Sequence, residues 1–529
     1  MVRGTVLTLA VAALAVAGLL PVLLMVGRSV LVDGQLSFAY YKTLLRTPAQ
    51  WELIANSLTL SSLTALFALL VGVPLGVLLG KTDLPLRQAL VVLFTVPLLL
   101  PPYITAVSWF DLLGRQGLLA DIAGTSLTEV TSRWLFGLPG CVLVLCATFL
   151  PIVILLTITF LRAVHPRLEE AGRLICPWPR VLRGITLPLI LPGVLLAGLL
   201  VFLLSLGEFG VPMFLRYNVF PVETFTQFSA FYNFGAAVAA AMPLLAITLV
   251  ALAVERLFLR RKTYRPLAAT AGKAWPIVSL GRLRPWLFAV TCLLACALVI
   301  VPYVALVVRS LSPGAYPEAL RRASDSLWRS LGYAALGATA ATLVGFPLGY
   351  LVNTRALRWW LSADSLSIFL FALPSTVIGI GLISLWNRPQ TAFIYATPAI
   401  IILGYVARYT ALASRISLCA LAHIPPSMEE AAQVAGAGWL RRVTLIVVPL
   451  AARGIAAAWL VGYIFCLRDT GLTMMVYPPG HDTLPVRIFT LMANGPPDLI
   501  AALCVIMVLA ALVPLGLLWL VLRLGARAK

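Results

Sequence analysis

Long apolar segments alternate with short polar ones along the whole 529-residue chain. A helix needs about 20 residues to cross a hydrocarbon core of about 30 Å, so apolar runs of that length between charges or prolines predict membrane spans. Such runs occur at 4–27, 53–80, 88–113, 139–161, 187–210, 236–258, 286–308, 329–353, 362–387, 395–420, 445–467 and 498–523. The pattern therefore predicts an all-α integral membrane protein with about 12 transmembrane helices.

The composition agrees with this fold class. Hydrophobic residues make up 61% of the chain and charged residues 11%, whereas about a quarter of the residues of a soluble protein are charged. The first apolar run follows Arg3 as in a signal peptide, but it is too long and lacks a small-residue cleavage site. We therefore expect it to be a retained membrane anchor.

The formal net charge of +20 reflects a bias of lysine and arginine toward one side of the membrane. With the N-terminus in the cytoplasm, the inside segments hold about 25 of the 39 basic residues and the outside segments about 13. The positive-inside rule then predicts a multi-pass protein with both termini in the cytoplasm. The basic connection 256–284 is expected to contact anionic membrane lipid. A nucleic-acid partner is excluded, because it would require these residues on one soluble face.

The chain contains an internal repeat. The segment "NSLTLSSLTALFALLVGVPLGVLLG" at 56–80 aligns without gaps with "RSLGYAALGATAATLVGFPLGYLVN" at 329–353. A second pair, "FTVPLLLPPYITAVSW" at 94–109 and "FALPSTVIGIGLISLW" at 371–386, follows in the same order. We predict two tandem six-helix units, 1–265 and 286–529, joined by a basic cytoplasmic linker, 266–285, in a parallel pseudo-two-fold arrangement typical of transporters.

Glycine and proline interrupt several predicted spans, and they allow two interpretations. Broken helices survive in a membrane where protein or a water-filled cavity covers the freed backbone, which would mark a solute pathway. Small residues also allow close packing between helices. The positions concerned are Gly72, Pro74, Gly76, Pro97, Pro374, Gly379 and Gly381.

A polar segment recurs once in each half, as "EEAGRLICPWPRVLRGITLP" at 169–188 and "EEAAQVAGAGWLRRVTLIVVP" at 429–449. Ser427 stands three residues before Glu430, a spacing that predicts a capping box at the start of a short helix. Small and apolar residues follow the acidic ones, so we expect each helix to dock on a partner protein. Gly436 permits a left-handed turn that Cys176 disfavours, so the two copies should turn differently.

These segments resemble the E-A-A-x-x-x-G motif followed by I-x-L-P of the membrane subunits of bacterial ABC importers that depend on a binding protein. The resemblance implies that each motif forms a coupling helix seated on a cytoplasmic ATPase. It also implies two copies of that ATPase subunit, an extracytoplasmic solute-binding protein and a location in the bacterial inner membrane. ATP and Mg would be bound by the partner subunits, with no cofactor on this chain. The coupling residues would be Glu170, Ala171, Gly172, Glu430, Ala431, Ala432 and Gly436.

The solute is suggested by a segment of the second half. "LRDTGLTMMVYPPGHDTLPVRI" at 467–488 resembles the R-E-L-P-x-T-L-L-L-x-P-P-G-x-x-T-L-x-x-R segment of fused ferric-iron permeases. Residues 469–471 depart from the E-L-P core of that pattern. The resemblance implies ferric iron as the solute and leaves thiamine, a phosphonate or a polyamine as alternatives.

Candidate pathway residues occupy equivalent positions in the two halves. Glu208 corresponds to Asp469, which follows Arg468, and Asn233 corresponds to Asn494. The two carboxylates could pass on a cation, or each could pair with an arginine or cap a helix. No metal site is predicted, because the three histidines are scattered and the eight cysteines lack ligand spacing.

A secondary transporter and an enzyme are the two alternative classes of protein. A secondary transporter would keep ionisable residues within its spans, and Arg408 is the clearest candidate for such a residue. An enzyme is not predicted, because neither a nucleophile nor an acid-base constellation occurs. The run "GVLLGKT" at 76–82 is too short for a phosphate-binding loop and follows an apolar span rather than a strand, so ATP hydrolysis must come from partner subunits.

Overall fold

A computed structural model describes residues 2–32, 35–38, 41–42, 46–115, 117–123, 125–231, 234–259 and 277–527. These residues are helical apart from turns and one short antiparallel pair, β1 (Leu31–Val32) with β2 (Gln35–Leu36). Ten helices in this part of the chain are long and apolar enough to cross a membrane, or 12 if each of two bent pairs is one span. The expected all-α membrane fold is confirmed.

Packing groups the chain into two compact units that do not follow the two halves of the sequence. Unit 1 comprises Met1–Thr47, Glu223–Leu245 and Pro313–Lys529, and unit 2 comprises Pro48–Val222 and Ala246–Ser312. The first helical segment of each half therefore packs in the unit that the other half mainly builds. The boundaries of 1–265 and 286–529 stay a prediction about the repeat, whereas the packing units combine segments from both halves.

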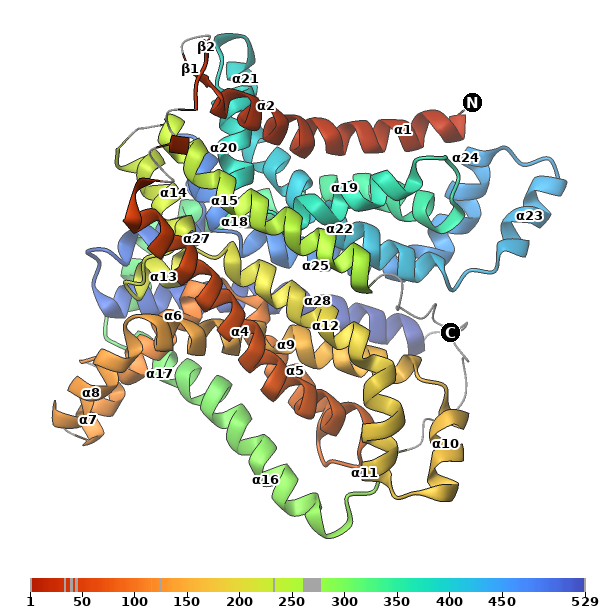
Figure 1. The fold of residues 1–529 in the computed structure, drawn as a ribbon, viewed down its shortest axis with the longest axis horizontal. Helices are drawn as coiled ribbons and strands as arrows, with labels where there is room; N and C mark the ends of the chain where they lie inside the picture. Colours follow the sequence, from red (N-terminus) through yellow and green to blue (C-terminus); the bar gives the residue numbers. More distant parts are fainter. Residues whose placement is uncertain are drawn as a thin grey trace. The chain divides into compact units, whose positions relative to one another are not determined.

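Unit 2 is built around the long helix α4, which packs against α9 and α12 (Figure 1). Helix α17, from the second half of the sequence, lies along α6. Its elements are α4 (Pro48–Lys81), α5 (Arg87–Thr95), η2 (Val96–Leu99), α6 (Pro102–Leu113), α7 (Leu118–Ala123), α8 (Thr125–Leu135), α9 (Leu138–Ala163), α10 (Pro166–Ile175), α11 (Trp178–Val181), η3 (Leu182–Thr186), α12 (Leu187–Leu206), α13 (Gly210–Phe214), η4 (Glu255–Leu259), η5 (Gly281–Leu283), α16 (Arg284–Ala295), η6 (Cys296–Ile300) and α17 (Val301–Ser310).

Unit 1 repeats this plan around the long helix α18, which packs against α22 and α25. Helix α2, from the first half of the sequence, lies along α20. The elements are α1 (Val2–Leu14), η1 (Ala15–Leu19), α2 (Leu20–Ser29), α18 (Ala315–Thr354), α19 (Trp360–Ala372), α20 (Ser375–Trp386), η7 (Pro389–Thr391), α21 (Ala392–Tyr395), α22 (Ala399–Leu421), α23 (Pro426–Val434), α24 (Trp439–Arg442), η8 (Val443–Val447), α25 (Val448–Leu467), α26 (Gly471–Val476), α27 (Leu484–Leu491) and α28 (Pro497–Arg527). Helices α14 (Phe220–Ser229) and α15 (Phe234–Val254) contribute to both units.

Glycines set how closely the long helices approach their neighbours. A Cβ atom added at Gly72 would lie 2.8 Å from the Val153 side chain of α9. A Cβ atom added at Gly345 would lie 2.6 Å from the Ala413 Cβ of α22. Both long helices run unbroken through their internal prolines, Pro74 and Pro347. Of the two interpretations of Gly72, Pro74 and Gly76, the broken-helix one is therefore wrong, and the glycines are points of close packing.

The expected breaks occur instead in the spans predicted at 88–113 and 362–387. The first is bent by 103° between η2 and α6, and the second is bent by 107° between α19 and α20. The second break falls at Leu373 and Pro374, so the broken-helix interpretation holds at Pro374. In the first half Pro97 lies within η2, and the chain turns at Leu100 and Pro101.

The glycine contact in unit 1 gives a testable prediction. Gly345→Ala should destabilise the protein by about 1–3 kcal/mol, because the new methyl group would overlap the backbone and side chains of α22. Gly332→Ala in the same helix is the matched control, since no atom lies within 4 Å of its added Cβ. Thermal unfolding of the purified variants in detergent measures the difference. Equal midpoints for the two variants would contradict the close-packing assignment.

Candidate functional site

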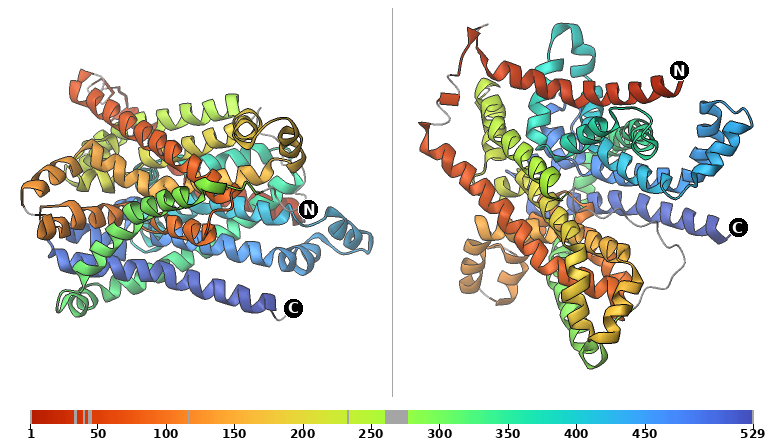
Figure 2. Two further views of the ribbon diagram at one scale, coloured as in Figure 1. Left: turned by 90° about the horizontal axis from the view of Figure 1, so that it is seen from below. Right: turned by 45° about the vertical axis from the view of Figure 1, so that its right-hand side comes forward.

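The two polar repeats form short helices, α10 and α23, that project beyond the spanning helices (Figures 1 and 2). Each is followed by one more helical turn, α11 or α24, and by a π-helical turn, η3 or η8, that leads into a long apolar helix. The π-helical turns recur at corresponding places of the repeat, η3 at Leu182–Thr186 and η8 at Val443–Val447. The two motifs therefore share one local architecture.

Each short helix ends in exposed apolar residues. Leu174 and Ile175 are each 89% exposed at the end of α10, and Val434 is 90% exposed at the end of α23. Four of the predicted coupling residues on these helices are also at the surface: Glu170, Ala171, Glu430 and Ala431. About nine-tenths of each of these three side chains is therefore outside the packing of its own chain.

Three details of these helices differ from the sequence predictions. Gly172 faces its own chain, because an added Cβ would lie 2.7 Å from the Ile185 side chain, and Ala432 is half-buried. Helix α23 begins at Pro426, and no side-chain cap forms at its start, so the capping box predicted from Ser427 is wrong. In α10 the cap is instead the imidazole of His165, which accepts a hydrogen bond of 3.3 Å from the Arg167 backbone N–H.

The predicted difference between the two turns is confirmed. Gly436 ends α23 with φ of 82°, in the left-handed region that glycine adopts at low cost. Cys176 ends α10 with φ of −147° and ψ of 156°, which is extended backbone. The chain therefore leaves the two short helices in different directions.

A fully buried glutamate anchors α10 and was not singled out from the sequence. Glu169 forms an ion pair with Lys81 at the end of α4 and accepts a hydrogen bond of 2.9 Å from the Thr186 hydroxyl. Lys81 is the lysine of the "GKT" run, so this run ends a spanning helix and binds a carboxylate of the same chain. The available sequence signal was a lysine at the end of an apolar span.

The corresponding glutamate of α23 has different partners. Glu429 accepts a hydrogen bond of 2.7 Å from the Tyr350 hydroxyl of α18 and lies 3.6 Å from the Arg442 guanidinium. The Tyr350 oxygen also accepts a hydrogen bond of 3.2 Å from the Trp439 indole N–H. Both short helices are thus fixed to the end of a long spanning helix through the first glutamate of the "EE" pair, and the second glutamate is left at the surface.

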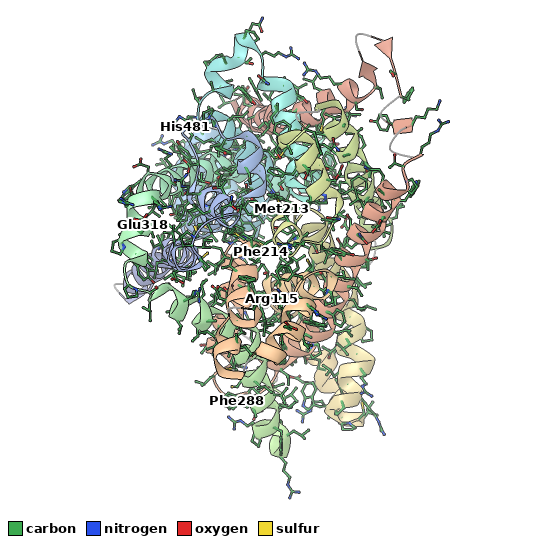
Figure 3. All side chains as sticks on the ribbon, turned by 90° about the vertical axis from the view of Figure 1, so that its left-hand side faces the viewer. Arg115, Met213, Phe214, Phe288, Glu318 and His481 are labelled. Atoms are coloured by element: carbon green, nitrogen blue, oxygen red, sulfur yellow. The ribbon has the colours of Figure 1, made fainter. Side chains whose placement is uncertain are left out.

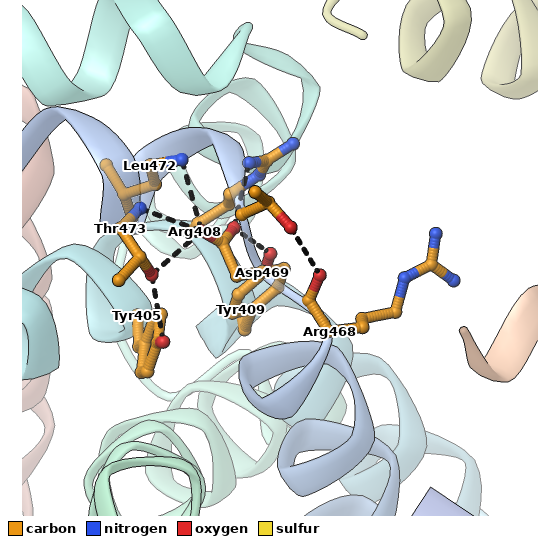
Figure 4. A network of polar contacts seen from close by, with 8 residues as sticks. Tyr405, Arg408, Tyr409, Arg468, Asp469, Leu472 and Thr473 are labelled. Carbon is orange, nitrogen blue, oxygen red and sulfur yellow. Dashed lines mark hydrogen bonds and ion pairs between the residues drawn. The ribbon is translucent and has the colours of Figure 1, made fainter. Parts of the chain in front are cut away.

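Asp469 is the centre of a buried polar network in unit 1 (Figure 4). Its carboxylate accepts hydrogen bonds from Arg408 at 3.1 Å and from the Tyr409 hydroxyl at 2.5 Å. It also accepts from the backbone N–H groups of Leu472 and Thr473, at 3.1 and 3.0 Å, and so caps α26. Arg408 and Asp469 therefore satisfy each other, as buried charges in a membrane must.

The other pathway candidates lie at helix ends. Glu208 is half-buried after α12 and accepts a hydrogen bond of 3.0 Å from the Gly210 N–H. The buried Arg468 guanidinium lies 5.1 Å from the centre of the Phe465 ring. Asn494 is exposed in the turn between α27 and α28. Asn233 lies outside the described residues. Glu208 belongs to unit 2, whereas Arg468 and Asn494 belong to unit 1.

The segment that resembles the ferric-iron permeases is hydrogen-bonded to α18. Asp482 binds the Arg329 guanidinium and the Ser326 hydroxyl, each at 2.8 Å. His481, labelled in Figure 3, is joined to the Tyr333 hydroxyl by a hydrogen bond of 2.8 Å. Gly480 has φ of 78°, which explains the glycine of the motif. Within the described ranges, no group of three or more His, Cys, Asp or Glu side chains could hold a metal ion.

Similarity to known proteins agrees with a membrane subunit that docks on partners. A model of the family described as "Binding-protein-dependent transport system inner membrane component" matches residues 72–264. This match includes α10, the first of the two short helices.

Three relatives define the similarity further. The molybdenum transport system permease protein ModB of Escherichia coli K12 is 33% identical over 190 residues, which cover 35% of this chain and 80% of the relative. The putative ferric transport system permease protein FbpB 1 of Haemophilus influenzae is 24% identical over 470 residues, with 83% of this chain and 72% of the relative covered. FbpB of Actinobacillus pleuropneumoniae is 24% identical over 82% of this chain and 65% of its own length.

The chain is therefore a multi-pass membrane permease. It belongs to the family of inner-membrane components of binding-protein-dependent transport systems. Its likeness to the FbpB relatives extends over most of its length, as expected for a fused permease.

Proposed function

We propose that this chain is the permease of an ATP-driven importer, which takes a solute from an extracytoplasmic binding protein and moves it into the cytoplasm by alternating access. The observation that carries the proposal is the pair of short helices with exposed apolar ends, each anchored to a long spanning helix. Such helices can transmit a movement of a soluble motor to the membrane part.

The proposal includes two copies of a cytoplasmic ATPase subunit, one for each short helix. ATP and Mg belong to those subunits, and this chain contributes no cofactor. Both termini would then lie in the cytoplasm, on the side of α10 and α23, in accord with the distribution of basic residues.

Ferric iron is the solute that the comparisons favour. The relatives described as ferric transport permeases align with more than four fifths of this chain, whereas ModB of Escherichia coli aligns with 35% of it. Molybdate is the second candidate. Thiamine, a phosphonate and a polyamine rest on the sequence pattern alone. The test is which of these solutes, presented by its binding protein, stimulates ATP hydrolysis in the reconstituted complex.

We also propose that the solute pathway includes Glu208, Arg468, Asn494 and Asn233. Asp469 is a weaker candidate, because its carboxylate is already used by Arg408, Tyr409 and α26. Its role in our proposal is to hold the end of α25 in shape beside the pathway.

A substitution on α23 tests the docking role. Glu430→Lys should leave the protein folded and inserted, because this side chain is at the surface. It should uncouple ATP hydrolysis from uptake, since the reversed charge meets the ATPase. Uptake and ATP hydrolysis are measured together in proteoliposomes. Normal solute-stimulated turnover by the variant would show that α23 does not couple the two activities.

A further inference from the structure

We propose that Glu169 and Glu429 are positioning residues, each of which ties a coupling helix to two spanning elements at once. One element is the long helix of the same half, and the other is the start of the first helix of the opposite half. A movement of one ATPase would thereby reach segments of both halves directly. The inference rests on the proposed function and concerns how the short helices transmit force.

The first junction consists of Lys81, Glu169 and Thr186 with the segment 278–280. The Lys81 side chain binds Glu169 of α10, and both side chains are buried. The backbone of the same Lys81 accepts a hydrogen bond of 2.9 Å from the Val278 N–H. Two residues on, Asp83 donates its N–H to the Val278 carbonyl at 3.2 Å. The Asp83 carboxylate also accepts a hydrogen bond of 3.0 Å from the Leu280 N–H. Leu280 immediately precedes η5 and α16, the first spanning segment of the second half.

The second junction consists of Arg3, Tyr350, Glu429 and Arg442. Tyr350 near the end of α18 donates its hydroxyl proton to Glu429 of α23 at 2.7 Å. The Arg3 guanidinium lies over the ring of the same Tyr350, 5.7 Å from the ring centre. Arg3 belongs to α1, the first spanning segment of the first half. One residue of the long helix therefore again joins a coupling helix to the first helix of the opposite half, here through its side chain alone.

The recurrence of this link argues for a function beyond local packing. The glutamates occupy corresponding positions of the repeat, but their partners are a lysine in one junction and a tyrosine in the other. A lysine in one half and a tyrosine in the other thus make the same connection between a coupling helix, a long helix and the first helix of the opposite half. Buried polar groups bonded on several sides resist separation, so the joined elements should move together.

Space beside each junction would let the joined elements move. A cavity of about 780 Å³ borders Leu79, Gly80 and Ile277 beside the first junction. A cavity of about 390 Å³ borders Arg3, Tyr350 and Glu429 at the second. The second junction thus borders its cavity directly, whereas Lys81, Glu169 and Thr186 of the first are buried and the space lies beside their chain neighbours.

The test uses the full complex of permease, ATPase subunits and binding protein in proteoliposomes. The first variant combines Lys81→Met with Glu169→Gln, which removes both charges together and leaves no buried charge uncompensated. The second is Tyr350→Phe, which removes the hydroxyl bonded to Glu429 and keeps the ring beneath Arg3. Tyr333→Phe is the matched control, because it removes a tyrosine hydrogen bond, to His481, elsewhere on the same helix α18. The readouts are solute moved per ATP hydrolysed and the amount of ATPase that co-purifies.

We expect the solute moved per ATP to fall about fivefold or more in the double variant and about twofold or more in Tyr350→Phe. The ATPase should co-purify with both variants at the wild-type level, and Tyr333→Phe should keep the wild-type ratio. An unchanged ratio in both test variants would overturn the proposal. Loss of the ATPase from both would also overturn it, because the glutamates would then act in docking. Failure of the wild-type chain to bind any ATPase would instead refute the proposed function.

Discussion

Replacing Leu174, Ile175 and Val434 with aspartate is expected to weaken binding of the ATPase subunits at least about 30-fold, the usual effect of losing an interface hot spot. These three side chains are about nine-tenths exposed, so they contribute little to the packing of their own chain. Buried at an interface, an aspartate would lose its hydration without gaining a partner. Affinity is measured with purified ATPase and the detergent-solubilised permease. Yield and thermal stability of the variant should match the wild type.

Leu311→Asp is the control for this variant. Leu311 is an exposed leucine, at 67%, and it follows the end of α17, the end remote from the first junction. ATPase affinity should be unchanged in Leu311→Asp. Unchanged affinity in the triple variant as well would show that α10 and α23 do not carry the docking surface.

Arg408→Leu is expected to cause the largest loss of stability among single substitutions in unit 1. It would leave the Asp469 carboxylate buried without its ion-pair partner. Breaking a buried pair in this way costs about 3–5 kcal/mol. The yield of monodisperse protein and its unfolding temperature in detergent should both fall.

A second substitution should restore much of this loss. Asp469→Asn added to Arg408→Leu removes the uncompensated charge, and its side-chain oxygen can still cap α26. Arg321→Leu is the control, since Arg321 forms an exposed ion pair with Glu318, which is labelled in Figure 3. A double variant as unstable as Arg408→Leu alone would show that charge compensation is not the reason for the effect.

The spans could be predicted from the sequence because the requirement they meet is local. Each stretch of backbone in a membrane must satisfy its own hydrogen bonds, so length and hydropathy suffice to identify it. The break at Pro374 was visible for the same reason, since proline removes a donor within its own helix. The exchange of the first helices between the units was not visible. It depends on which apolar surfaces fit together, and the helices share similar apolar compositions.

The candidate site shows the same limit at the scale of single residues. The repeat identified the two short helices, but it could not show which glutamate of each "EE" pair faces inward. Burial of Glu169 is decided by Lys81, 88 positions away in the sequence. Once Glu169 points inward, the helical period also turns Gly172 toward the protein and leaves Glu170 outside. The role of Gly172 in coupling stays a prediction, and its inward orientation was not visible because the motif fixes the helix and not its rotation.

The exchange of first helices has a consequence for biosynthesis. Helices α1 and α2 are synthesised long before their packing partners in unit 1, which begin at α18, some 286 residues after α2 ends at Ser29. At about 5–20 residues per second, synthesis of that interval takes roughly 15–60 s. During this time Leu7 and Leu14, which are buried in the finished protein, must be covered by lipid or by the insertion machinery. Helix α1 therefore waits for most of this interval before it can reach its final neighbours.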